Sequence, residues 1–171
     1  MPDLPLSRDR LQPARFDRLV DDGSGGRAED PFRGRVIDRA RLRELVRRDL
    51  GWLLNSTASL TADEAERYPQ AARSTINFGI RPLAGRTVSH DEVEPIRRML
   101  HDSIAHFEPR LLRDTLVVRP VVGPGRKGAL HFEIAAQLWA HPYPIDLLLR
   151  TSIDLDTGDS EVTEGRPGGE A

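Results

Sequence analysis

The spacing of apolar residues changes part-way along the chain, and this change limits the folds that the sequence can adopt. In the first half, apolar residues recur at three- and four-residue steps, as they do on one face of an amphipathic helix. These positions are Leu42, Leu45, Val46, Leu50, Leu53 and Leu54, followed by Val93, Ile96, Leu100, Ile104, Phe107 and Leu111. In 130–138 and 145–155, apolar side chains alternate with others, which is typical of half-buried strands. This order predicts an α+β fold, with N-terminal helices packed on one face of a small, mainly antiparallel sheet formed by the C-terminal half.

Turn and capping residues predict where these elements begin and end. We expect helices at 36–54, from the capping box Thr61 to Glu64, at 70–76 and at 90–106. Strands are expected at 116–122, 130–138, 145–155 and 160–162, with a hairpin loop at 123–128. Pro95 falls inside the last helix, so that helix should begin at Pro95 or bend in its first turn, because an interior proline removes a hydrogen bond.

The length of 171 residues fits one compact domain with short appendages. Residues 1–34 are rich in proline, glycine and charge, so we expect a flexible arm with a docking patch at 16–20 that includes Phe16 and Leu19. The domain itself should occupy 35–162. Residues 163–171 contain no apolar cluster to bury and should form a disordered tail.

The charge balance argues against a nucleic-acid or membrane protein. Lysines and arginines number 25 against 27 aspartates and glutamates, a net charge of -2. Residues 33–50 do carry seven arginines against three acids, whereas 154–171 carry six acids and one arginine. We expect these two poles to face different partners, and we expect no binding of nucleic acid because the arginine face lacks interleaved aromatic residues. No stretch approaches the roughly 18 apolar residues of a membrane span, and no signal peptide is recognisable. The expectation is therefore a cytoplasmic protein that does not insert into the membrane.

Motifs for cofactor or metal chemistry are weak. The chain has no cysteine, and the glycine-rich stretch at 123–128 lacks the Gly-Lys-Ser/Thr order of a phosphate-binding loop. Asp102 and His106 share a helix face at a four-residue step, which favours a surface ion pair over a metal site. We expect no catalytic residue, no cofactor and no metal.

The most informative short string is Glu108-Pro109-Arg110. Proline disfavours helical geometry in the residue before it, so the helix should stop at this corner and present the carboxylate and the guanidinium on opposite sides. One interpretation is a helix stop with a surface ion pair. The other is a recognition corner, in which Arg110 binds a partner carboxylate and Glu108 accepts a hydrogen bond. The neighbouring arginine favours the ionised carboxylate, which works against general-acid chemistry at Glu108.

Four segments of the chain also occur, in this order, in one known family. They are Phe16 to Asp22, Val46 to Asn55, Tyr68 and Pro69 with Ala72 to Gly79, and Ile104 to Leu111. Within the helical segments the matching positions include Arg48, Asp49, Leu50, Leu53, Leu54, Asn55, Asn77 and Gly79. With these segments the chain resembles the TssE family of type VI secretion baseplate proteins, which are related to phage-tail baseplate wedge proteins once labelled lysozyme-like.

The resemblance implies a structural subunit of a ring assembly and not an enzyme. It implies other wedge subunits and the contractile sheath as partners, and a place at the inner face of the cell envelope through the secretion machine. By the same resemblance, Glu108, Pro109 and Arg110 attach the domain to neighbouring subunits, and the sheet offers the first template for the sheath. We expect the strands at 145–155 and 160–162 to form the edge to which a partner strand adds. The historical label, with Glu108 and Asp114 near in sequence, leaves peptidoglycan hydrolysis as the alternative.

Overall fold

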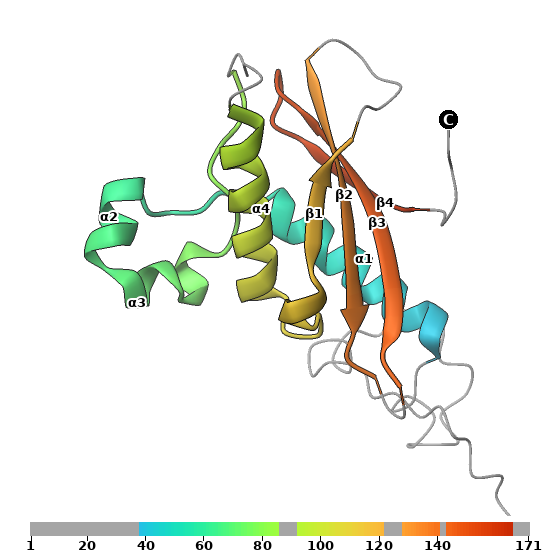
Figure 1. Ribbon diagram of the computed structural model, residues 1–171. Helices are drawn as coiled ribbons and strands as arrows, with labels where there is room; N and C mark the ends of the chain where they lie inside the picture. The colour runs from blue at the N-terminus through green and yellow to red at the C-terminus, as the bar shows by residue number, and fades with distance from the viewer. Residues whose placement is uncertain (1–37, 86–91, 122–127, 141–142, 166–171) are drawn as a thin grey trace, which may run out of the picture.

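The computed structural model describes residues 38–85, 92–121, 128–140 and 143–165 (Figure 1). The expected arm at 1–34, with Phe16 and Leu19, and most of the expected hairpin loop lie outside the described residues. The first half is helical and the second half forms a four-stranded antiparallel sheet, so the predicted α+β fold is confirmed. The helices are α1 (Arg39–Leu54), α2 (Ala62–Arg67), α3 (Pro69–Ala72) and α4 (Val93–Phe107), with short 3-10 turns η2 (Thr75–Asn77) and η4 (Arg113–Thr115). The strands are β1 (Val117–Pro120), β2 (Ala129–Leu138), β3 (Ile145–Asp154) and β4 (Ser160–Glu164).

Helix α1 packs its apolar stripe into the core between the helices and the sheet. It begins at Arg39, later than expected, because Asp38 is extended and its side chain accepts a hydrogen bond from the Arg41 N–H, at 2.7 Å. The buried positions of the helix are Leu42, Leu45, Val46, Leu50, Leu53 and Leu54, all of which the apolar spacing predicted.

Helices α2 and α3 form an excursion that projects from the body of the domain (Figure 1). The predicted capping box is present, because Thr61 Oγ1 accepts from the Glu64 N–H and Glu64 Oε2 accepts from the Thr61 N–H. The single helical piece expected at 70–76 is wrong. Ser74 is extended and divides this stretch into α3 and the 3-10 turn η2. Neither α2 nor α3 contains a buried residue.

Helix α4 contains Pro95 without loss of a hydrogen bond. The helix begins at Val93, which places Pro95 in the first turn, where backbone N–H groups have no acceptor within the helix. It ends at Phe107, and the Glu108 N–H donates to the Ile104 carbonyl at 3.0 Å. The proline at position 109 thus marks the end of the helix as predicted.

The sheet has the strand order β1-β2-β3-β4, with each strand antiparallel to its neighbour. The edge strands are β1 and β4, so the expected edge region is correct for 160–162. Strand β3 lies between β2 and β4, but β4 pairs with it only at 149–153, so of 145–155 only the first residues extend past β4 along this edge. The disordered tail was expected to begin at residue 163, which is too early in the sequence. Strand β4 continues through Glu164, and the Gly165 N–H donates to the Leu148 carbonyl at 2.8 Å.

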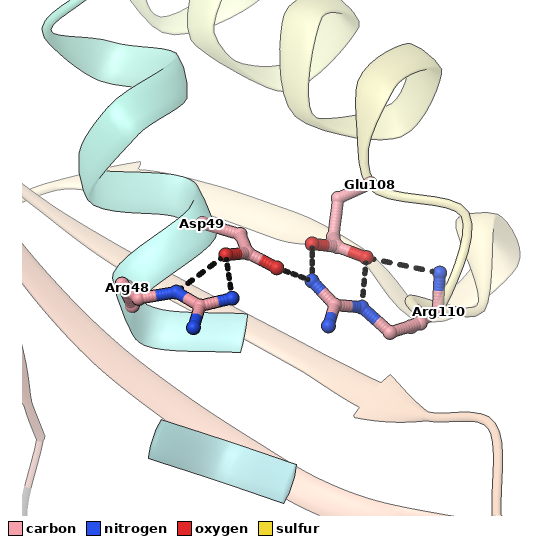
Figure 2. Close-up of polar contacts among 4 residues, drawn as sticks. All are labelled: Arg48, Asp49, Glu108 and Arg110. Carbon is pink, nitrogen blue, oxygen red and sulfur yellow. Dashed lines mark hydrogen bonds and ion pairs between the residues drawn. The ribbon is translucent and has the colours of Figure 1, made fainter. Parts of the chain in front are cut away.

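One hydrophobic core joins the helices to one face of the sheet. Side chains buried in alternation along β2 and β3 pack with the apolar stripes of α1 and α4. The largest fully buried side chains include Phe132, Ile134 and Leu149 of the sheet, Leu50 of α1 and Leu100 of α4. This packing brings the end of α4 close to α1, so that Asp49 of α1 meets the charged residues that follow α4 (Figure 2).

Candidate functional site

The corner after α4 folds Arg110 back onto Glu108. Arg110 donates from Nε to Glu108 Oε1 at 2.7 Å and from Nη2 to Oε2 at 2.5 Å, and its backbone N–H donates to Oε1 at 3.1 Å. Glu108 is 4% exposed and the Arg110 side chain 21% exposed, whereas Pro109 between them is exposed. The expectation that the corner presents these two charges on opposite sides is therefore wrong, because the turn at Pro109 lets the guanidinium form a two-pronged bond with the carboxylate. The ion-pair interpretation is correct, but the pair is largely buried.

Asp49 of α1 completes a connection between two helices. Arg110 Nη2 donates to Asp49 Oδ2 at 2.5 Å, and Asp49 Oδ1 accepts from Nε and Nη2 of Arg48, at 2.9 and 2.7 Å. Figure 2 shows the four side chains in a row, in the order Arg48, Asp49, Arg110 and Glu108. Positive and negative charges alternate along this row, so each charge has an opposite neighbour and the row as a whole is neutral. We call these four residues the charge row.

The surroundings of Arg110 raise the pKa of its guanidinium. Burial by itself lowers the pKa of the guanidinium, but the hydrogen bonds and negative charges of Glu108 and Asp49 outweigh burial and raise the pKa above its ordinary value. Within the described part of the chain, Nη1 of Arg110 is buried and has no hydrogen-bond acceptor. A buried donor without an acceptor is unfavourable, so this guanidinium is held in place by its other two nitrogens.

The charge row reaches the surface at Trp52. The guanidinium carbon of Arg48 lies 4.6 Å from the centre of the Trp52 ring, within the range of a cation–π contact. Trp52 is 50% exposed although it is one of the largest apolar side chains in the domain. The rigid row therefore supports an exposed aromatic ring on α1, one helical turn from Arg48.

The family-like residues outside the charge row have structural contacts. Leu50, Leu53 and Leu54 are buried in the core. Asn77 ties the excursion together, since its Oδ1 accepts from the Leu60 N–H at 3.0 Å and its Nδ2 donates to the Ala72 carbonyl at 3.1 Å.

Gly79 has a separate structural role, because its φ of +128° lies in a region that favours glycine. A Cβ at this position would lie 2.3 Å from the Ser56 carbonyl oxygen. The next residue, Ile80, donates its N–H to that same oxygen at 2.9 Å. Glycine thus allows the segment after the excursion to lie directly against the end of α1.

Two arginines of α1 and Asn55, the residue that caps its C-terminus, have contacts that the sequence analysis did not predict. Arg43 donates from Nη2 to the Asp146 carbonyl at 3.1 Å, and Arg47 from Nη1 to the Val162 carbonyl at 3.3 Å. Asn55 forms two hydrogen bonds with the backbone of Ser160. Arg43 and Arg47 bind the sheet of their own chain. Fewer arginines of α1 are therefore available to a partner protein than the sequence analysis expected. The sequence feature that could have predicted these contacts is the four-residue spacing of positions 43, 47, 51 and 55.

The family model of baseplate wedge protein gp25 matches residues 40–143, which include all four residues of the charge row. The chain belongs to the baseplate wedge protein gp25 family. No curated protein and no solved structure matches the chain. The family is one of structural subunits of phage-tail-like baseplates, to which TssE also belongs, and assembly with other baseplate subunits follows from that membership.

The gp25-family corner does not have the geometry of a hydrolase. Both carboxylate oxygens of Glu108 accept hydrogen bonds from Arg110, and the residue is buried. A general acid must reach its substrate, whereas both oxygens of this carboxylate are occupied by Arg110 and shielded from solvent. Asp114 lies in η4 and is exposed. The contacts of Glu108 thus offer no support for peptidoglycan hydrolysis.

Two histidines of α4 have contacts other than the one that the sequence predicted. The expected Asp102–His106 pair is wrong, since Asp102 Oδ1 lies 3.0 Å from His101 Nδ1 and His106 Nε2 contacts the Arg73 carbonyl oxygen. Among the described residues, no three histidines, cysteines or carboxylates are grouped to hold a metal. No helix in the described ranges is long and apolar enough to cross a membrane.

Proposed function

We propose that this gp25-family protein is a TssE-like wedge subunit of a type VI secretion baseplate, located in the cytoplasm against the inner face of the envelope. The observation that carries the proposal is the charge row, which joins the end of α4 to the middle of α1 within the region matched by the family. A partly buried ionic connection of this kind adds little net stability, because desolvation of the charges opposes it. It is better suited to holding a surface in one geometry than to adding stability.

The proposed docking surface for neighbouring wedge subunits consists of Pro109, between Glu108 and Arg110 in the corner, and Trp52, which contacts Arg48 at the other end of the charge row. Pro109 is exposed at the tip of the corner, and Trp52 is half exposed over Arg48. Aromatic and arginine side chains are enriched at the centres of protein interfaces. In this proposal Glu108 and Arg110 act by positioning the corner, and the expected patch of Phe16 and Leu19 in the arm contributes a second attachment.

The proposal includes a role for the sheet as the first template of the contractile sheath. An edge strand offers N–H and carbonyl groups to which a partner strand can add. The candidates are β1 and β4, the two edges of the sheet. Strand β1 carries Pro120, which lacks an N–H group and shortens the edge available for pairing.

Co-purification with candidate wedge and sheath subunits tests the assignment. We expect the wild-type protein to be retained by the wedge subunits, and a chain that stays alone with all of them would overturn the proposal. Trp52→Ala should reduce retention at least about tenfold, by loss of an aromatic contact at the interface. Tyr68→Ala is a matched control, because Tyr68 is also half exposed and lies under an arginine, Arg67. Equal retention of Trp52→Ala and wild type would remove this docking surface while leaving the family assignment unchanged.

A further inference from the structure

The outer edge of β4 can be assigned from its pairing with β3. In an antiparallel pair, successive residues turn their N–H and carbonyl groups alternately toward and away from the neighbouring strand. The Gly165 N–H donates to the Leu148 carbonyl, and Arg150 pairs with Thr163 in the same register. Residues 161, 163 and 165 therefore face β3. The backbone groups of Ser160, Val162 and Glu164 face the open edge of the sheet.

Side chains of α1 occupy part of this open edge. Asn55 donates from Nδ2 to the Ser160 carbonyl and accepts at Oδ1 from the Ser160 N–H, both at 2.8 Å. This is the pair of hydrogen bonds that a residue of an adjacent strand would form. Arg47 donates to the Val162 carbonyl at 3.3 Å. Two of the three outward-facing residues of β4 thus have partners supplied by a helix.

Helix α1 also binds the open edge of the sheet beyond the end of β4, at a carbonyl group of β3. Asp146 lies two residues before Leu148 on β3, so its carbonyl faces the same side of the sheet, and Arg43 donates to it at 3.1 Å. Positions 43, 47, 51 and 55 lie at four-residue steps on one face of the helix. Gly51 occupies the remaining position of this stripe and has no neighbour within 4 Å of the place where a Cβ would stand.

We infer that Arg43, Arg47 and Asn55 form an edge guard, which closes β4 against pairing with β4 of a second copy of this chain. An uncovered edge strand is a ready template for such pairing. The sequence of β4 suits a two-fold symmetric pair centred on Val162, in which Glu161 faces Thr163 and Ser160 faces Glu164 of the second copy. In that arrangement no two side chains of like charge face each other directly. Charge repulsion between facing residues therefore does not prevent the pairing. Strand addition at β4 therefore requires the guard to be displaced.

Self-association of guard variants tests this inference by sedimentation velocity over a range of protein concentrations. We expect Arg47→Ala with Asn55→Ala to associate at least about tenfold more tightly than wild type. Adding Glu164→Pro should return the protein to wild-type behaviour, because this residue is exposed and its N–H faces the open edge and not β3. Arg98→Ala on α4 is the control for loss of an exposed arginine. Wild-type association of the double variant, or association that Glu164→Pro leaves unchanged, would overturn the inference.

Hydrogen exchange in the single variants provides a second measurement. Asn55 also donates to the Gly51 carbonyl at the end of α1, so Asn55→Ala affects the helix as well as the edge. Arg47→Ala leaves that contact in place, and it should still raise association above wild type. In Asn55→Ala the Ser160 N–H should exchange at least about tenfold faster, while ladder amides such as Ser152 keep their protection. Unchanged exchange at Ser160 would show that Asn55 does not cover the edge.

Discussion

Arg110 binds Asp49 across 61 positions of the sequence, and this contact joins the corner after α4 to the middle of α1. Arg110 shares its guanidinium between Asp49 and Glu108, so the two carboxylates together hold the corner against α1. The pair Glu108 and Arg110 therefore acts inside the domain, and its influence on partners passes through the surface that it positions.

Glu108→Gln should destabilise the fold by about 3 kcal/mol, because it leaves the charge of Arg110 partly buried with one carboxylate in place of two. Urea unfolding followed by circular dichroism measures the change. Glu94→Gln serves as the control, since this side chain is 49% exposed and its ion pairs with Arg97 and Arg98 lie at the surface. The control should change stability much less, because ion pairs at the surface are screened by solvent. Equal effects of the two substitutions would contradict a buried role for Glu108.

Thr151→Val should stabilise the protein by about 1 kcal/mol. Thr151 is 2% exposed on β3, and its hydroxyl has no hydrogen-bond partner among the described residues. Valine has nearly the same shape without the buried polar group, so the unfavourable desolvation is removed. Thr163→Val is the matched control, because the Thr163 hydroxyl is exposed and donates to the Arg150 carbonyl. A loss of stability in Thr151→Val would indicate that the hydroxyl has a partner.

Gly79→Ala should destabilise the domain by at least about 2 kcal/mol, since alanine is strained at positive φ and its Cβ would overlap the Ser56 carbonyl. The substitution should also disrupt the bridge between Thr57 and Ile80. Gly51→Ala provides a comparison of opposite sign. It lies in the interior of α1 with open space around it, so alanine should stabilise the protein by about 0.5–1 kcal/mol. Thermal melts of both variants measure the difference.

The carboxyl group of Glu94 should titrate with a pKa of about 2, below its ordinary value of 4.5. The hydrogen bond from Arg97 is the main cause, and that from Arg98 adds to it. Because the pKa is lower in the folded state, the contribution of Glu94 to stability is present above about pH 4.5 and is lost as the pH falls toward 2. Arg97→Gln should raise this pKa, as followed by the carboxyl resonance in a pH titration. The same midpoint in both proteins would mean that Arg97 does not set it.

The amino-acid sequence by itself determined the kind and order of the elements. The apolar stripe of α1, the capping box of Thr61 and Glu64, and the alternation along β2 and β3 all depend on residues a few positions apart. Such patterns reflect the geometry of one helix turn or one strand repeat, so they can be recognised without knowledge of the rest of the fold. The family resemblance seen in the sequence is likewise confirmed, by a family model that matches residues 40–143.

Only the tertiary structure decided which distant groups meet. The sequence showed Arg47, Asn55 and Arg110 as polar residues of helices and turns, and their partners are Val162, Ser160 and Asp49, more than 60 positions away in each case. The order of strands placed β3 between two neighbours and β4 at the edge of the sheet, whereas the sequence indicated only that both segments are strands. Whether a charge faces a partner protein or its own sheet depends on how α1 and α4 pack against the strands. That packing depends on the whole core and not on any local pattern.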